Sequence, residues 1–490
     1  MTYLYSETPE FFSELCEEIR LFIDIRRIEK LKTDEFEKDG FFVLHYFVRG
    51  EGSVESTARI ANDGEIVAEY TYECAAQSGE LARKRAEKRA AKISLYRALS
   101  GHFGKAMPWG SLTGIRPTKL LRDSQMRLGK AKAQALFLNE FDVSEEKLAF
   151  AQRIVDVQQR LLPSGENNID VYIGIPFCTT RCAYCSFASS TPDVFADAEQ
   201  LYMDALTDEL NILDDLLEGK VVRAVYVGGG TPTAISDENL KKILSIAAKI
   251  GADEFTVEAG RPDTITQSKL KLIKQSGAKR ISVNAQTLRD DTLSRIGRCH
   301  TAQDFFEAYN MARQAGFESI NVDLIAGLPG ESADDLVNTL EQIMRLEPQN
   351  ITVHTLAIKR ASKFAAQNMD ALPSSEDTRD ALKKAADMLE KAGYAPYYMY
   401  RQKYMKGSME NVGYAKHGKE CLYNIDNMED ACSVAAFGAG GISKRVFGGV
   451  QAAGNETGQR IERAANVKDL REYIARTGEM RKRKRRLFEV

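Results

Sequence analysis

Apolar runs of strand character recur through the middle of the chain. They cover residues 170–177, 223–230, 254–260, 280–286, 319–328 and 350–357. Stretches with apolar positions at helical spacing separate them, at 198–218, 236–249, 302–315 and 332–346. Strands that alternate with helices fold as right-handed βαβ units around a parallel sheet. The pattern predicts an α/β fold, an open six-unit (β/α)6 parallel partial barrel that is two units short of a closed barrel.

The N-terminal part follows a different pattern. Residues 41–50, 53–62 and 65–74 alternate apolar and polar positions, as half-buried strands do. A helical stretch precedes them, and a second helix with a basic face follows. We expect a small α+β domain over 1–105 and a helical connector over 106–166. The basic face is interpreted as solvated, and no nucleic acid partner is expected because no aromatic stacking motif accompanies it.

Composition narrows the class of protein. The 490 residues carry a net charge of −3, with 43% hydrophobic and 28% charged positions, which is ordinary for a globular protein. No apolar run approaches the ~18 residues of a membrane span, and the first residues do not resemble a secretory signal. Eight cysteines are too few for a disulfide framework. Three cluster and five are scattered, which indicates a reducing compartment and therefore the cytoplasm.

The three clustered cysteines directly follow the first apolar run. Cys178, Cys182 and Cys185 are spaced C-x3-C-x2-C. A structural zinc site needs four ligands, so these three cysteines alone cannot complete one. The alternative to a functional metal site is a loose group of thiols or a zinc loop that lacks a ligand. Three thiolates suit a [4Fe-4S] cluster that keeps one iron open. Because the run ends at Pro176, we expect this loop at the C-terminal end of a strand, where α/β folds place their sites.

Polar and glycine-rich positions follow the later runs. Residues 228–233 read Gly-Gly-Gly-Thr-Pro-Thr, and their backbone can approach a ligand closely. Glu258 and Gln286 end the third and fourth runs. Asp323 lies inside the fifth run, where a charge is costly to bury without a partner. We therefore expect a functional role for Asp323.

These motifs together resemble a known family. C-x3-C-x-aromatic-C, preceded by Y-x-G-I-P-F-C and followed by V-G-G-G-T-P-T, is similar to the radical S-adenosylmethionine (SAM) enzymes. Within them, it resembles the oxygen-independent coproporphyrinogen III dehydrogenases and their relatives, most specifically over residues 170–357. The resemblance implies a [4Fe-4S] cluster with SAM at its open iron. It also implies oxidative decarboxylation of coproporphyrinogen III to protoporphyrinogen IX in heme biosynthesis.

The resemblance also implies roles for single residues. Cys178, Cys182 and Cys185 would be metal ligands and part of the catalytic centre, and Tyr184 would pack on the adenine of SAM. The other SAM contacts would be Tyr172, Gly229, Gly230, Thr231, Glu258, Gln286, Arg298, Asp323 and Ala357. The core would span 167–360, followed by a C-terminal tetrapyrrole-binding α/β extension over 361–490.

The implied partners are a tetrapyrrole, either coproporphyrinogen III or heme, and a low-potential electron donor such as flavodoxin or ferredoxin. Arg401 and Lys403 are candidates to pair with propionates. The basic run 481–486 is interpreted as a solvated tail, with propionates, membrane surface or nucleic acid as other possible contacts. The acid–base candidates, namely His300, His354 and His417, are interpreted as structural.

Two departures from the family motifs leave the reaction undecided. Phe187 stands where the dehydrogenases carry a fourth cysteine. Residues 410–415, Glu-Asn-Val-Gly-Tyr-Ala, lack the histidine and tryptophan of the H-N-x-x-Y-W motif of heme-binding relatives. The alternatives are therefore a heme-binding carrier or chaperone and a heme-degrading radical methyltransferase of the same superfamily.

Overall fold

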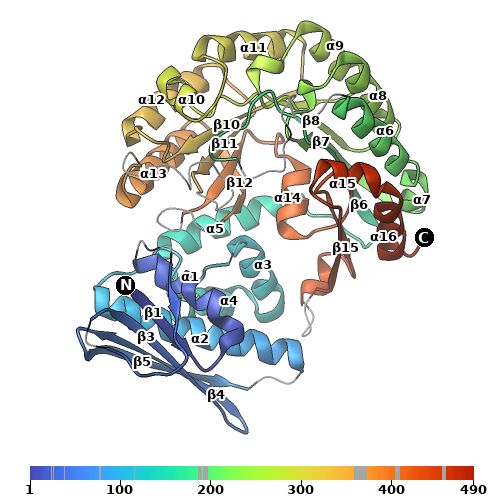
Figure 1. Cartoon of the computed structure of the whole chain (residues 1–490). Coiled ribbons are helices and arrows are strands. Elements are labelled where there is room, and N and C mark those ends of the chain that lie inside the picture. The colour runs from blue at the N-terminus through green and yellow to red at the C-terminus, as the bar shows by residue number, and fades with distance from the viewer. Residues whose placement is uncertain are drawn as a thin grey trace. The chain divides into compact units, whose positions relative to one another are not determined.

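The computed structural model divides into two compact units, Met1–Gln152 and Arg153–Val490 (Figure 1). It describes all residues except 24, 26, 38, 77–78, 115, 186–189, 191–196, 358–371, 403–408 and 455–458. Within the described residues, no helix has the length and the apolar character needed to cross a membrane.

The first unit contains a five-stranded sheet in the order β2-β1-β3-β4-β5. Its strands are β1 (Thr2–Ser6), β2 (Glu29–Lys30), β3 (Phe41–Arg49), β4 (Ser53–Asn62) and β5 (Glu65–Ala75). The last three form the antiparallel meander that the alternating pattern predicts. Strands β1 and β2, which pair in parallel, were not predicted because each is too short to show a period.

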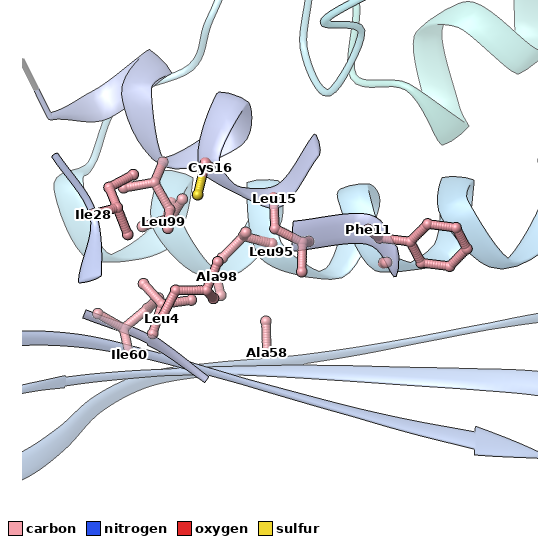
Figure 2. Close-up of a cluster of buried hydrophobic side chains, with 13 residues drawn as sticks. Leu4, Phe11, Leu15, Cys16, Ile28, Ala58, Ile60, Leu95, Ala98 and Leu99 are labelled. Atoms are coloured by element: carbon pink, nitrogen blue, oxygen red, sulfur yellow. The ribbon is translucent and has the colours of Figure 1, made fainter. Parts of the chain in front are cut away.

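Two helices pack on one face of this sheet, α1 (Phe12–Phe22) and α2 (Glu80–Phe103). Figure 2 shows Leu15 and Cys16 of α1 near Leu95 and Leu99 of α2, above Ala58 of β4. The unit continues with α3 (Pro117–Leu128), α4 (Lys130–Ala135) and a π-helical turn (Leu136–Glu140), and α5 follows (Glu145–Gln158). The buried cluster is the core that gives this α+β unit its own stability.

The basic face of α2 is largely paired within the first unit. Lys92 lies 3.2 Å from the buried carboxylate of Glu18, and Lys88 lies 3.6 Å from Glu14, both on α1. The guanidinium of Arg89 lies over the ring of Phe141. These cations therefore hold neighbouring elements in place, in addition to meeting solvent.

The second unit is built on six strands that pair in parallel in the order β11-β10-β9-β8-β7-β6. They are β6 (Asn168–Ile175), β7 (Val221–Gly229), β8 (Glu254–Glu258), β9 (Arg280–Ser282), β10 (Ser319–Ala326) and β11 (Asn350–Thr355). Most of their side chains are buried on both faces, as in a parallel sheet covered by helices. The predicted open (β/α)6 partial barrel is confirmed.

Helices follow each core strand, and Figure 1 shows them in an arc outside the strands. They are α6 (Ala198–Leu210), α7 (Leu213–Leu217), α8 (Asp237–Ala248), α9 (Gln267–Gln275), α10 (Asp290–Arg295), α11 (Ala302–Gln314), α12 (Ala333–Arg345) and α13 (Ser375–Lys391). Capping boxes start α11, α12 and α13. Each satisfies backbone N–H groups that a helix start leaves unpaired. The predicted stretch 198–218 is two helices, α6 and α7.

The C-terminal residues extend the sheet at both edges. Strand β13 (Asn411–Ala415) runs antiparallel beside β11, and β12 (Ala395–Tyr400) lies beyond it. At the other edge β14 (Ser433–Phe437) runs parallel to β6, followed by β15 (Ile442–Val446) and β16 (Ile461–Ala465). The six core strands therefore pair in parallel, as predicted, and the extension adds antiparallel strands outside them.

We expected the basic C-terminal run to be a solvated tail, but the structure shows otherwise. It lies in α16 (Thr477–Phe488), which follows α14 (Leu422–Glu429) and α15 (Leu470–Ala475). Lys484 is 0% exposed, and its Nζ donates to Glu209 at 2.5 Å and to Asn466 at 2.7 Å. The helix is therefore fixed to α6 by acidic partners that are distant in sequence.

Candidate active site

The cysteine loop begins where β6 ends. The N–H of Ser190 donates to Pro176 O at 2.7 Å, and the N–H of Cys178 donates to Ser190 O at 3.1 Å. A further turn forms as the N–H of Cys185 donates to Cys182 O at 3.1 Å. Cys178, Cys182 and Cys185 are thiols that take part in no disulfide bond. The short loop therefore presents three soft ligands at the C-terminal end of a core strand.

The donor set fits an iron–sulfur cluster better than a single metal ion. Among the described residues, the one group whose three ligand atoms all lie within 4.8 Å of one another is Asp170, Asp426 and Cys432. The three loop thiols are not such a group. Three soft thiolates on one loop suit an iron–sulfur cluster.

The glycine turn at the end of β7 packs against the cysteine loop. The N–H of Gly230 donates to Ile175 O at 2.8 Å, and that of Thr231 donates to Phe177 O at 2.7 Å. A Cβ at Gly230 would lie 2.6 Å from Phe177 O and 3.1 Å from Cys178 Sγ. Glycine is therefore required for this close approach.

Glu258 ends β8 beside the same turn. It accepts a hydrogen bond from the hydroxyl of Tyr226 at 2.5 Å and another from the N–H of Gly229 at 3.2 Å. Burial raises the pKa of Glu258 to about 7, the bond from Tyr226 opposes this shift, and the charge of Asp323 adds to it. The ring of Tyr172 stacks on that of Tyr226, with centroids 6.3 Å apart. Four of the predicted SAM contacts, Tyr172, Gly229, Gly230 and Glu258, therefore adjoin one another.

Arg298 lies after α10 and contacts both the end of β8 and the cysteine loop. Its Nη1 donates to Gly260 O at 3.0 Å, and its Nη2 donates to the hydroxyl of Tyr184 at 3.3 Å. The buried Nε has no hydrogen-bond partner among the described residues. A buried N–H on a cation normally has an acceptor, so this atom suits an anionic ligand group.

Asp323 and Gln286 meet between β9 and β10. The N–H of Gln286 donates to Asp323 O at 2.8 Å, with Gln286 in a left-handed conformation at φ 65°. Regular pairing of β9 stops at Ser282, earlier than predicted, and Gln286 rejoins β10 through a single bridge to Leu324. Burial of the Asp323 carboxyl opposes its ionisation, but hydrogen bonding to His354 keeps its pKa below the usual value. Asp323 therefore remains a carboxylate able to bind hydroxyl groups.

The remaining predicted residues are less closely joined to this group. Ala357 lies just beyond the end of β11, and Arg401 is buried just beyond the end of β12. His300 is buried, and burial with the nearby charge of Arg298 lowers its pKa to about 4. His417 is exposed. Lys403 and Phe187 lie outside the described residues.

The sequence analysis missed Arg261, which lies shortly after the end of β8. Its guanidinium is 3% exposed and contacts the cysteine loop. The available signal was an arginine between a glycine and a proline at the end of a core strand, where site residues gather.

Comparisons with known proteins agree with this arrangement. The model of the Radical SAM superfamily matches residues 172–343. The chain is 37% identical over 390 residues to the oxygen-independent coproporphyrinogen-III oxidase-like protein HemZ of Bacillus subtilis (strain 168), covering 77% of this chain and 76% of that protein. It is 30% identical over 279 residues to the heme chaperone HemW of the same organism, covering 55% of this chain and 69% of that protein.

Among solved structures, coproporphyrinogen III oxidase (HemN) of Escherichia coli has the same fold. The TM-score is 0.51 at 23% identity, and the match covers 69% of this chain and 74% of that chain. Radical SAM proteins use a [4Fe-4S] cluster and SAM as cofactors. The predicted resemblance is confirmed: the chain belongs to the radical SAM superfamily, in the family of the HemZ-type, oxygen-independent coproporphyrinogen-III oxidase-like proteins.

Proposed function

We propose that this protein catalyses the oxygen-independent oxidative decarboxylation of coproporphyrinogen III. In that reaction each of two propionate side chains loses a hydrogen atom, an electron and CO2, and becomes a vinyl group. The product is protoporphyrinogen IX. The similarity to HemZ, whose name describes it as oxidase-like, supports this substrate class.

In this proposal Cys178, Cys182 and Cys185 hold the cluster. The bound cluster and SAM together supply a carbon-centred radical that can remove a hydrogen atom from an unactivated C–H bond. The protein binds and orients SAM and keeps water away from the reacting atoms. Low-potential electrons come from a donor protein of the flavodoxin or ferredoxin class.

Each SAM group has a matching side chain. The unpaired Nε of Arg298 suits the carboxylate of the methionine part. The carboxylates of Glu258 and Asp323 suit hydroxyl or ammonium groups, and the side-chain amide of Gln286 can also bind a hydroxyl. Tyr184, which accepts a hydrogen bond from Arg298, would pack on the adenine.

One observation carries the proposal. The thiol loop after β6 is joined to the glycine turn after β7, since Thr231 donates to Phe177 O and its hydroxyl lies 3.4 Å from Cys178 Sγ. In this proposal a cluster ligand therefore adjoins the glycine turn, which the family resemblance assigns to the methionine amino group of SAM.

A heme chaperone is the second candidate, because HemW is also a relative. The stretch 410–415 bears on it. This stretch has no histidine, and most of it forms β13, with Tyr414 buried between β11 and β12. It therefore offers no axial heme ligand, and we favour the enzyme.

The test is an anaerobic assay on the reconstituted protein with SAM, reductant and coproporphyrinogen III. Mass spectrometry should find two successive losses, each of CO2 with two hydrogens, together with 5′-deoxyadenosine. The matched control is Cys182→Ala, which should give neither product. Stoichiometric heme binding without turnover would favour the chaperone instead, and a methylated linear tetrapyrrole from heme would indicate a heme-degrading methyltransferase.

A further inference from the structure

Arg261 connects the end of β8 to the cysteine loop. Its Nη1 donates to Thr180 O at 3.0 Å, and its Nη2 donates to Thr180 Oγ1 at 2.9 Å. The same Nη1 lies 3.6 Å from Cys182 Sγ, within hydrogen-bond range for sulfur. One buried guanidinium therefore contacts both the backbone of the loop and one of its thiols.

Neighbouring groups hold this guanidinium in position. Its Nε donates to Asp263 at 3.1 Å, and the hydroxyl of Thr179 donates to the other oxygen of that carboxylate at 2.6 Å. The hydroxyl of Thr180 in turn donates to Gly297 O at 2.8 Å. The loop between Cys178 and Cys182 is thus tied at three points to the ends of β8 and α10.

Only arginine has the donors for this set of bonds. Its planar guanidinium donates at once to the two oxygens of Thr180, to the Asp263 carboxylate and toward a sulfur. A lysine ammonium has three donors on a single nitrogen and cannot reach all of them. Asp263 balances part of the charge, but the N–H that points at the sulfur remains. Hydrogen bonds to cluster sulfurs are among the factors that set a cluster's reduction potential.

We propose that Arg261 is a positioning residue for the cluster, and that it raises the cluster's reduction potential. On reduction, one electron passes from a low-potential donor to the cluster, and no covalent bond forms or breaks. The extra negative charge reaches the thiolates, where a positive N–H donor stabilises it. The inference rests on the proposed role of Cys182 as a ligand and is independent of the tetrapyrrole substrate.

The experiment compares the wild type with Arg261→Met and Arg261→Lys after anaerobic reconstitution. Iron and sulfide per chain are measured first, then the midpoint potential by redox titration with an EPR readout, and then the rate of cluster loss to an iron chelator. Arg289→Met is the matched control, since that arginine is partly exposed and pairs with Asp291 and Asp335.

In Arg261→Met, the ratio of reduced to oxidised cluster at a fixed potential should fall about tenfold. This corresponds to a midpoint potential about 59 mV more negative. Chelator should remove its cluster faster than from the wild type. Arg261→Lys keeps the charge, so its potential should shift less while its cluster is still lost faster. Arg289→Met should match the wild type in both measurements.

An Arg261→Met protein with the wild-type midpoint and loss rate would overturn the inference. If that variant fails to fold, Thr180→Val is used instead, since it removes one acceptor of the same network. Wild-type cluster retention in both Thr180→Val and Arg261→Lys would also overturn the inference. A wild type that binds no iron and sulfide would instead refute the cysteine assignment, so the two failures are distinguishable.

Discussion

Glu258 and Tyr226 share a 2.5 Å hydrogen bond where strands β8 and β7 end. Because burial raises the pKa of Glu258 to about 7, this carboxyl is partly protonated near neutral pH. Its proposed role as an acceptor for SAM requires the carboxylate. The affinity for SAM should therefore rise between about pH 6 and pH 8.

Calorimetric titration of SAM into the reconstituted protein at a series of pH values measures this dependence. Glu258→Gln should bind more weakly and lose the dependence, while Glu341→Gln, an exposed site on α12, should keep it. An unchanged pH profile in Glu258→Gln would exclude the proposed role.

The same carboxyl should affect the stability of the cofactor-free protein. Its pKa is higher in the folded chain, about 7, than the ordinary value of 4.5. Between these values the folded state binds more protons than the unfolded state, so stability falls as the pH rises and then levels off above pH 7. The loss amounts to at most about 3 kcal/mol.

Glu258→Gln mimics the protonated form and should remove this loss. Its melting temperature relative to the wild type should be higher at pH 8 than at pH 4.5. Differential scanning calorimetry on cofactor-free samples measures the difference, and a constant offset at the two pH values would contradict the expectation.

Arg298→Lys should weaken SAM binding and leave the cluster in place. Lysine keeps the charge but loses the fork that reaches Gly260 O and Tyr184, along with the unpaired Nε. We expect at least a tenfold increase in Kd, or about 1.4 kcal/mol. Arg295→Lys, at the end of α10, is the control, and equal Kd values for the two variants would reject the assignment.

Cys182→Ala should prevent assembly of the cluster. Two thiolates cannot replace three, so iron and sulfide content and visible absorbance should both be largely lost. Cys299→Ala is the matched control because this exposed thiol lies 3.9 Å from Thr180 and is not part of the motif. A normal cluster in Cys182→Ala, or its loss in Cys299→Ala, would require a different ligand set.

Removal of one partner of the buried pair Lys484–Glu209 should destabilise the second unit. Lys484→Met leaves the Glu209 carboxylate buried without its cation, although Tyr473 and Gly438 still donate to it. Such a change costs about 3–5 kcal/mol. Glu209→Gln with Lys484→Met should lose less stability than the single change, as measured by denaturant unfolding; Lys482→Met is the surface control.

The sequence was sufficient to predict the six core strands and the loop chemistry. Core strands that are buried on both faces appear as continuous apolar runs, and C-x3-C-x2-C is local, so no partner had to be found at a distance. A capping box is equally local, because it spans only four positions, as at the start of α13.

Features that depend on distant partners could not be predicted. Nothing local indicates that Ser433–Phe437 pairs with β6 or that Lys484 meets Glu209. Residue type alone indicates neither the early end of β9 at Ser282 nor the left-handed backbone at Gln286. Arg261 was not predicted because its role follows from its contacts with Thr180 and Cys182, which are distant in sequence.

The way the extension borders the core has a consequence for biosynthesis. Strand β6 gains its second neighbour from residues 433–437, far downstream, and β11 gains its own from residues 411–415. At about 5–20 residues per second, β6 therefore waits about 10–50 s for its second neighbour, and β11 waits about 3–12 s. Unpaired edge strands can form hydrogen bonds with strands of other chains. A chain truncated before residue 411 should therefore depend on chaperones and aggregate where the full chain does not.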